Sequence, residues 1–533
     1  MFKITHANFK DKEYGTEEYL TNWPMVYILE NGRQAYIGET NHAKNRMSQH
    51  LGTLEKRIYD KVHFIYSAKF NQSVTLDYEA KLIQYIAADE MYEVRNKNAG
   101  MADKAYYQKK EYDEKFHLLW RRLQQEGLVK RSLEEIENSD LFKYSPYKEL
   151  NEDQRTAVEA ILYALENDLH QKIVVNGTPG SGKTIVAVFL MKYLKDSEEF
   201  QNKKIGFVVP QTSLRETMKK IFRSIYNLQA ADVLSPSEVT RDHYDILIVD
   251  EAHRLHQYKN ISYRGAFKKS CERIGLTTTS DELDWILKQC DCPILFYDRQ
   301  QVVGPSGIDV ERFEKKLKSD MAARTTRYCT LMTQMRVKGG NAYLDYIQAI
   351  LEEKGPEKQE FFAYDFKIID HFRDFERLMY QKEAETGLSR MVAGYAWEWQ
   401  SKRDETKTDI EIEDVSKKWN RTMKNWVHLP GAVDEVGCIH SIQGYDLNYV
   451  FVILGNEISY DPEQDKIVIK PENYFDQNGK NTASYEELLA YIKHIYYVLM
   501  TRGIRGTYLY VCDPELKKYL EQYIEVEDMR EHE

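Results

Sequence analysis

Two groups of residues in this chain have the types and the spacing that phosphate chemistry requires. The first is a glycine-rich stretch between the apolar run KIVVN and the helix-like run IVAVFLMKYL. This GxxxxGK[ST] pattern predicts a loop that binds the phosphates of ATP, because glycines let backbone N–H groups surround the β-phosphate and the following helix N-terminus favours negative charge. The lysine reaches the β- and γ-phosphate oxygens, and the threonine hydroxyl holds Mg²⁺. The loop consists of Gly177, Thr178, Pro179, Gly180, Ser181, Gly182, Lys183 and Thr184.

Acidic residues follow this loop at the end of a later strand-like run, DILIV. Asp250 is placed to complete the Mg²⁺ shell, and Glu251 is placed to orient and deprotonate the attacking water. The next apolar run, PILFYD, leads from Asp298 to Gln301, whose amide would report whether ATP or ADP is bound. Each group alone is also explained by a helix N-terminus or a polar turn. Behind a phosphate loop, the set indicates ATP hydrolysis.

The second group lies in the first hundred residues. It contains two tyrosines on a predicted hairpin, an arginine and a histidine one helical turn apart, a glutamate on a second helix and an asparagine after it. A phenol, an arginine and a carboxylate-bound divalent metal can supply what phosphodiester hydrolysis needs. Strand packing explains either tyrosine alone better, so it is the ordered set that favours a nuclease site. The six residues are Tyr27, Tyr36, Arg46, His50, Glu79 and Asn96.

Length and composition limit the kind of protein that positions these residues. The 533 residues exceed a single domain of about 150 residues, and 42% hydrophobic with 30% charged residues exclude wholesale disorder. The net charge of −11 argues against a broadly basic surface for nucleic acid, but residues 1–150 are neutral and the excess acid lies beyond them. With no signal-like or membrane-spanning apolar stretch and six scattered cysteines, we expect a cytoplasmic protein with no membrane partner.

The apolar pattern predicts an α/β fold that positions both groups. Residues 1–100 indicate a small α/β unit, and residues 101–146 a charged helical connector. From residue 147 on, short β-branched runs alternate with amphipathic helices, which is typical of doubly wound parallel sheets. We expect two such lobes, one over 147–325 and one over 326–533. The second lobe begins with the run RYCTLMTQ and carries two polar insertions.

The ordered motifs of residues 147–515 resemble those of superfamily 1 helicases, and more closely those of a bacterial helicase-like ATPase family related to the carboxy-terminal domains of Schlafen proteins. The resemblance implies two RecA-like lobes. It implies that Gln154 reads adenine and that Arg336 and Arg502 reach ATP from the second lobe, which would make hydrolysis depend on closure. It also implies that the motif IHSIQGYD couples the nucleotide to nucleic acid, with Asp446 in place of a more usual glutamate. The coupling residues of this motif are His440, Gln443, Gly444 and Asp446.

Residues 23–100 resemble the GIY-YIG nuclease family, with Met25-Val26-Tyr27 in place of Gly-Ile-Tyr. The resemblance implies that Tyr27 or Tyr36 activates water and that Arg46 contacts the phosphate. It further implies that Glu79 binds one divalent metal ion, Mg²⁺ or Mn²⁺, and that Asn96 supports the site.

Together these resemblances lead us to expect an ATP-driven nucleic-acid translocase or helicase fused to a metal-dependent endonuclease. We expect DNA with a single-stranded tract as the partner and leave the oligomeric state open. The architecture resembles bacterial proteins that defend against phage or plasmid DNA, and DNA repair is the second role considered. Two alternatives remain open: an ATP-gated switch that regulates the nuclease without unwinding, and a nuclease-like domain that only binds DNA.

Overall fold

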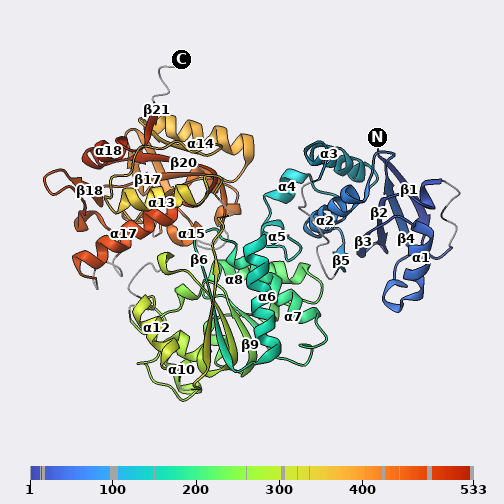
Figure 1. Cartoon of the computed structure of the whole chain (residues 1–533). Helices are drawn as coiled ribbons and strands as arrows, with labels where there is room; N and C mark the ends of the chain where they lie inside the picture. Colours follow the sequence, from blue (N-terminus) through green and yellow to red (C-terminus); the bar gives the residue numbers. More distant parts are fainter. Residues whose placement is uncertain are drawn as a thin grey trace. The chain divides into compact units, whose positions relative to one another are not determined.

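The computed structural model shows a mixed α/β chain built on parallel and mixed sheets, which confirms the predicted class of fold (Figure 1). The structure describes residues 2–11, 14, 18–96, 106–148, 150–259, 261–301, 306–320, 322–334, 337–402, 404–422, 426–442, 445–476, 480 and 483–527. None of the helices within these ranges is long and apolar enough to cross a membrane. The chain forms two compact units, the first made of Met1–Glu152, Thr184–Lys203 and Met218–Val233, and the second of Asp153–Lys183, Lys204–Thr217 and Leu234–Glu533.

The first unit begins with a five-stranded sheet that carries the predicted hairpin. The two hairpin strands pair antiparallel around a turn at Gly32, whose φ of 81° is readily adopted by glycine. Met25 stands where the family's motif has glycine, and its side chain is fully buried in the core of this sheet. The replacement therefore adds apolar packing. In pairing order the strands are β1 (Lys3–Asn8), β4 (Lys61–Tyr66), β2 (Met25–Glu30), β3 (Gln34–Thr40) and β5 (Glu93–Val94).

Several helices accompany this sheet. In α2 the side chain of Asn71 caps the first turn by accepting a hydrogen bond from the Val74 N–H at 3.0 Å. The helix predicted for the connector is divided, because the chain leaves it at Gly127 with a φ of 70°. The Asp89 carboxylate, at the end of α2, then accepts from the N–H groups of Lys130 and Arg131. These helices are α1 (Ala43–Gly52), η2 (Leu54–Lys56), α2 (Gln72–Asp89), α3 (Lys109–Gln125), α4 (Leu133–Glu137) and α5 (Asp140–Lys143).

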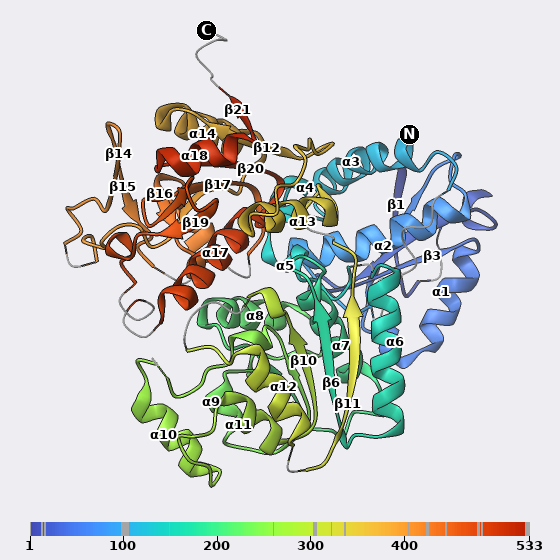
Figure 2. The same ribbon diagram turned by 60° about the vertical axis from the view of Figure 1, so that its left-hand side comes forward.

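A six-stranded sheet follows, with the order β11-β6-β10-β9-β7-β8. We expected the run around Arg327 to open the second lobe, but β11 pairs parallel with β6, with Arg327 opposite Ile173 (Figure 2). The apolar pattern identifies a strand without identifying its partner, so the lobe boundary falls later than expected. The strands are β6 (Gln171–Gly177), β7 (Ile205–Val208), β8 (Val233–Leu234), β9 (Tyr244–Val249), β10 (Cys290–Tyr297) and β11 (Thr325–Leu331).

The helices between these strands are mostly amphipathic. Along β9 and β10, Leu247, Val249 and Leu295 pack with Ile286 of α11 and Phe313 of α12 in one apolar cluster. The helices are α6 (Glu152–Asn167), α7 (Lys183–Asp196), α8 (Thr212–Ser224), α9 (Pro236–Val239), η4 (Ala252–Arg254), α10 (Arg264–Arg273), α11 (Glu282–Lys288), η5 (Arg299–Gln301) and α12 (Val310–Lys318).

The rest of the second unit is built on an eight-stranded sheet. Successive residues of its central strand β17 alternate between two cores: Val450 and Val452 join one cluster, whereas Phe451 and Ile453 join another. A sheet buried on both faces is what the doubly wound prediction requires. In order, the strands are β14 (Ile410–Ile412), β15 (Val415–Trp419), β16 (Glu435–Gly437), β13 (Ser389–Ala393), β17 (Leu447–Leu454), β20 (Gly503–Val511), β12 (Asp365–Ile369) and β21 (Glu525–Glu527).

Both polar insertions of this lobe contain strands. One forms the antiparallel pair β14 and β15, which extends the main sheet, and the other forms a separate hairpin of β18 (Ile458–Asp461) and β19 (Lys466–Ile469). Four longer helices pack on the two faces, and Phe372 and Phe375 of α14 belong to the cluster that includes Phe451. They are α13 (Gly340–Leu351), α14 (Phe372–Thr386), α17 (Tyr485–Met500) and α18 (Pro514–Glu521).

Candidate functional site

The nuclease-like group converges on the phenol of Tyr27. This residue lies in β2 opposite Gly38 of β3. A Cβ atom at Gly38 would lie 2.2 Å from the Tyr27 hydroxyl oxygen, so glycine is required there by the ring that crosses it. The Tyr27 oxygen lies 2.7 Å from Nε2 of His50 and accepts a hydrogen bond from Nε of Arg46 at 3.3 Å. Arg46 and His50 project from the same face of α1, as predicted.

The protonation states in this group follow from burial. Burial, followed by the charges of Arg46 and Lys56, lowers the pKa of His50 to about 4. Burial raises the pKa of Tyr27 well above its usual range. At neutral pH the imidazole is therefore neutral and the phenol protonated. In the tautomer that carries its proton on Nδ1, His50 accepts the hydrogen of the Tyr27 hydroxyl through Nε2. The two side chains can therefore relay a proton: the phenol oxygen takes up a proton from water while the phenol's own proton passes to the imidazole.

A carboxylate that sequence reasoning missed, Glu39, lies beside the predicted metal ligand Glu79. Burial and the neighbouring charge of Glu39 raise the pKa of Glu79 to about 7. Burial also raises the pKa of Glu39, whose Oε2 is buried with no hydrogen-bond partner among the described residues. Two neighbouring carboxylates with an unpartnered oxygen fit a divalent cation, which would offset their repulsion. The signal for Glu39 was its position directly after Gly38.

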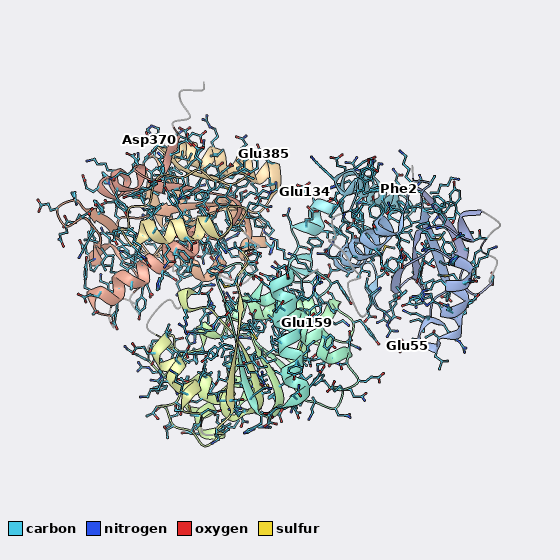
Figure 3. The ribbon with its side chains drawn as sticks, in the orientation of Figure 1. Phe2, Glu55, Glu134, Glu159, Asp370 and Glu385 are labelled. Carbon is cyan, nitrogen blue, oxygen red and sulfur yellow. The ribbon has the colours of Figure 1, made fainter. Side chains whose placement is uncertain are left out.

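Asn96 and Lys56 complete the surroundings of β3. Both polar atoms of the Asn96 amide bond to the backbone of Ile37, with Oδ1 accepting at 3.1 Å and Nδ2 donating at 2.8 Å. Asn96 therefore holds the strand that carries Tyr36. The ammonium of Lys56, on η2, lies 2.9 Å from the centroid of the Tyr36 ring. Its neighbour Glu55 is exposed to solvent (Figure 3). No sequence signal identified Lys56, because only the fold brings η2 beside β3.

The phosphate loop joins β6 to α7 as predicted. Gly180 and Gly182 adopt φ angles of 84° and 80°, a region that glycine enters freely. A Cβ atom at Gly177 would lie 2.4 Å from Oγ of Ser181, which shows how tightly the loop curls. Thr184 follows Lys183 as the second residue of α7. The loop therefore has the shape of a phosphate cradle.

Polar contacts lead from this loop to the last predicted arginine. The ammonium of Lys183 donates to the Gly177 carbonyl at 2.6 Å and to Asp298 Oδ2 at 2.9 Å. Gln301 Nε2 donates to the same Asp298 oxygen at 2.6 Å, and Arg502 Nη2 donates to Gln301 Oε1 at 3.1 Å. Asp298 thus joins Lys183 to Gln301, and Gln301 in turn joins them to Arg502. The three predicted residues come from motifs far apart in sequence.

The carboxylates after β9 are deeply buried. Asp250 is fully buried, and Glu251 has a left-handed φ of 54°, which is uncommon outside glycine and is found at functional sites. Oε2 of Glu251 lies 2.9 Å from Nε2 of His253 and 3.6 Å from Nε of Arg254. Although burial opposes it, the charges of His253, Arg254 and Lys183 hold the pKa of Glu251 below its usual range. Glu251 is therefore ionised and able to accept a proton.

Other predicted residues have different surroundings. Gln154 is buried and donates through Nε2 to the Ser181 carbonyl at 2.9 Å, so in this conformation its amide braces the loop. The side chain of Gln334, which was not predicted, lies where a Cβ atom at Gly180 would be. Asp446 is half-buried just before β17. The predicted residues Arg336, Gln443 and Gly444 lie outside the described residues.

A cavity of about 530 Å³ lies at the carboxyl ends of β7, β9 and β10. Ser213, His253 and Arg254 line it from the first lobe and His440 from the second. Gln211 Nε2 donates to the His440 carbonyl at 3.0 Å, which joins the lobes at its rim. Burial and the charge of Arg254 lower the pKa of His440 to about 4. The carboxyl ends of parallel strands are where α/β proteins bind ligands, but apart from His440 the sequence did not point to this cavity.

The chain matches two protein-family models. Residues 170–513 match the Schlafen group 3 DNA/RNA helicase domain, and residues 24–91 match the GIY-YIG catalytic domain. The chain belongs to the Schlafen group 3 helicase family and carries a GIY-YIG domain before the helicase domain. Both resemblances seen in the sequence are confirmed. The chain is therefore an enzyme that combines a helicase-type ATPase with an endonuclease domain.

Individual relatives share less with this chain. The uncharacterized protein YPL245W of Saccharomyces cerevisiae is 27% identical over 432 residues, which cover 70% of this chain and 90% of that one. The replication restart protein PriA of Bacillus subtilis is 29% identical over 175 residues, 32% of this chain and 21% of that one. Unliganded Pif1 from Bacteroides aligns over 68% of this chain and 92% of its own at 12% identity and a TM-score of 0.28. Mss116p bound to single-stranded RNA aligns over 71% and 78% at 12% identity and a TM-score of 0.30.

Proposed function

We propose that the chain is an ATP-driven translocase or helicase that brings DNA to its own metal-dependent endonuclease. The observation that carries this proposal is the hydrogen-bonded path from Lys183 through Asp298 and Gln301 to Arg502. A γ-phosphate near Lys183 would compete with Asp298 for the ammonium and so alter the position of Arg502 in the second lobe. ATP binding and hydrolysis would then move the lobes, as a motor requires.

At the ATPase site, the glycine-rich loop would hold the phosphates and Gln154 would contact the adenine. Thr184 and Asp250 would hold Mg²⁺, which supplies positive charge to the β- and γ-phosphate oxygens. Glu251 would take a proton from the attacking water. The water oxygen would bond to the γ-phosphorus as the bond from that phosphorus to the bridging oxygen breaks. Arg502 and Arg336 would stabilise the charge that develops on the γ-phosphate.

At the nuclease site, Tyr27 would take a proton from the attacking water while its own proton passes to His50. The water oxygen would bond to phosphorus as the bond to the leaving oxygen breaks. Arg46, whose Nε lies 3.3 Å from the Tyr27 oxygen, would neutralise the phosphate. Glu79, with Glu39 beside it, would hold the Mg²⁺ or Mn²⁺ that stabilises the leaving oxygen. Asn96 and Tyr36 would keep β3 in position.

We propose DNA with a single-stranded tract as the partner, with the cavity beside Arg254 as part of its path. Arginine and hydroxyl groups at this cavity suit a phosphodiester backbone. We further propose a role in the cytoplasm in defence against phage or plasmid DNA, with DNA repair as the competing role. A phage-plating assay beside a DNA-damage survival assay separates these roles, and protection in the second alone would favour repair.

An ATP-gated nuclease that does not unwind is supported by one specific set of contacts. The guanidinium of Arg95 lies 4.0 Å from the centroid of the Tyr226 ring, and the ammonium of Lys192 on α7 lies 5.7 Å from the same centroid. Because α7 begins at Lys183 and Arg95 precedes Asn96, nucleotide at the loop would be connected to β3. ATP would then change cleavage without strand displacement.

One experiment tests both functions. Purified protein is incubated with labelled single-stranded, duplex and forked DNA and RNA, with Mg²⁺ or Mn²⁺, and with or without ATP. We expect ATP-dependent displacement that Lys183→Ala abolishes and metal-dependent cleavage that Glu79→Ala abolishes. Hydrolysis of ATP without displacement of any strand would favour the gated nuclease, and cleavage that survives Glu79→Ala would contradict the nuclease assignment.

A further inference from the structure

Arg254 lies between the proposed catalytic base, Glu251, and the cavity of about 530 Å³. It ends η4, directly after the acidic motif, and its side chain is only 12% exposed. Its Nε lies 3.6 Å from Oε2 of Glu251, while Nε2 of His253 lies 2.9 Å from the same oxygen. The Glu251 carboxylate therefore has a close neighbour in His253 and a looser one in Arg254.

The guanidinium of Arg254 has fewer hydrogen bonds than its burial demands. Nε and Nη2 are both buried, and no described residue accepts a hydrogen bond from either. Arginine carries five N–H donors in a planar fork that matches carboxylate and phosphate oxygens. Burying such donors without acceptors is unfavourable, so the environment of Arg254 is suited to an anionic ligand that supplies them.

The cavity that Arg254 lines is suited to an anion. Ser213 also lines it, and its Oγ is buried with no partner among the described residues. Among the described lining residues, the one acidic side chain is Glu282. Its carboxylate already accepts from the His256 N–H at 2.9 Å and from the Tyr263 hydroxyl at 3.1 Å. An anion in the cavity would therefore find Arg254 and a hydroxyl available.

We propose that Arg254 is the residue through which nucleic acid controls ATP hydrolysis. A phosphate of a strand in the cavity binds the Arg254 guanidinium and draws it away from Glu251. The freed carboxylate then accepts the proton of the attacking water, while His253 keeps it in place. Arg254 acts through Glu251 and is a positioning residue. This inference rests on the proposed ATPase function.

The exchange follows from the strength of the two contacts. At 3.6 Å the Nε of Arg254 is beyond hydrogen-bond distance of Glu251, so this contact is a weak electrostatic one. A phosphate accepts two parallel N–H bonds from the same fork, and such charge-assisted pairs are among the strongest in proteins. In this position the guanidinium lies beside the oxygen with which Glu251 must reach the attacking water. Its departure therefore opens that oxygen to the water.

The test measures ATP hydrolysis by the full chain with and without a saturating single-stranded DNA oligonucleotide. Wild type is expected to hydrolyse ATP faster with the oligonucleotide. Arg254→Ala is expected to hydrolyse ATP faster than wild type without DNA, and its stimulation ratio is expected to fall to about one. Arg254→Lys keeps the charge but not the fork, so it is expected to retain an intermediate ratio. Lys259→Ala, an equal loss of charge at an exposed position, is expected to behave as wild type.

A second measurement detects the phosphate contact directly. The slope of log Kd for the same oligonucleotide against log salt is expected to decrease in size by about 0.7 in Arg254→Ala, and to remain unchanged in Lys259→Ala. If Arg254→Ala does not fold by circular dichroism, Arg254→Gln, which also removes the charge, carries both measurements.

Several outcomes would overturn the inference. Stimulation or a salt slope equal to that of wild type in the folded variant that lacks the Arg254 charge would do so, as would wild-type hydrolysis that does not respond to DNA. A wild-type protein that hydrolyses no ATP would instead contradict the proposed function.

Discussion

The two candidate active sites of this chain are assembled in different ways. The nuclease-like site is local: Tyr27, Arg46, His50 and Glu79 come from one hairpin and the two helices that follow it. The ATPase site joins segments from residue 154 to residue 502 through side-chain contacts between lobes. A local site keeps its geometry, whereas a site whose parts lie on separate elements changes when those elements move. We therefore expect cleavage to depend on a proton path that is already formed, and ATP hydrolysis to depend on hydrogen bonds that change partners when the lobes move.

The substitution with the largest expected effect, Tyr27→Phe, removes the proton path without changing the fold. In Tyr27→Phe the ring still fits over Gly38, but no hydroxyl takes a proton from water. We expect metal-dependent cleavage of labelled DNA to fall about 10²- to 10⁴-fold, the usual contribution of general acid–base catalysis, with ATP hydrolysis unchanged. Tyr85→Phe on α2 removes a hydroxyl that bonds to Glu137 at 2.7 Å and serves as the control. Equal cleavage by Tyr27→Phe and wild type would remove Tyr27 from the mechanism.

Loss of the loop lysine tests whether the two sites work independently. Lys183→Ala removes the charge that reaches the phosphates and also the contact to Asp298 at 2.9 Å. We expect ATP hydrolysis to fall on the order of 10²-fold, as for other preorganised groups that stabilise transition-state charge. Cleavage of a short single-stranded DNA should continue, because the nuclease site is local. Parallel loss of both activities would show that the nuclease is gated by nucleotide.

The steric fit of the hairpin gives a stability prediction. Gly38→Ala places a methyl group 2.2 Å from the Tyr27 hydroxyl, so the ring must move. We expect the free energy of unfolding of the first unit to fall by about 1–3 kcal/mol, as in overpacked cores, and cleavage to fall with it. Gly52→Ala on α1 meets nothing within 4 Å and is the matched control. Denaturant unfolding measures the free energy of unfolding of both variants. Equal destabilisation by Gly38→Ala and Gly52→Ala would contradict the steric account.

Lys56 tests how far the nuclease site extends beyond the motif residues. If its ammonium leaves the Tyr36 ring to bind a DNA phosphate, Lys56→Ala should weaken binding about tenfold, which is the worth of one charge-assisted hydrogen bond. The salt slope for duplex DNA should shrink by about 0.9. Lys110→Ala on α3 removes the same charge at an exposed position and should change neither quantity. An unchanged slope in Lys56→Ala would leave Lys56 as a packing residue of Tyr36.

The smallest expected effect concerns pH. The pKa of His50 is about 4 in the folded chain, against 6.5 for an unperturbed histidine, so the unfolded chain binds more protons between these values. The free energy of unfolding therefore rises with pH over this window, and the contribution of His50 to it is lost as pH falls from 6.5 toward 4. We expect His50→Gln to show a shallower loss than wild type in thermal unfolding measured across this range. An identical pH profile in the two proteins would indicate that His50 is protonated in the fold.

Much of this architecture was predictable because local patterns carry it. The hairpin, the phosphate loop and the buried strands each follow from apolar periodicity and turn residues within a short segment. The partner of a strand is not determined by local pattern: the residues of β11 predict a strand, and only its register with β6 assigns it to the first lobe. Lys56 was missed for the same reason, since its role depends on which segment the fold brings beside Tyr36. Glu39 had a signal in its position after Gly38, but only the fold places it beside Glu79.

The sequence by itself determined the two families, the order of the domains and the chemical types at each site, because these depend on residue identity and spacing along the chain. Only the tertiary structure decided which groups touch: that the Tyr27 hydroxyl lies against Nε2 of His50, that Asp298 joins Lys183 to Gln301, and that Arg254 lies between Glu251 and a cavity. Hydrogen bonds, burial and pKa shifts act over a few ångströms through space. Residues far apart in sequence acquire them only when the sheets and lobes assemble.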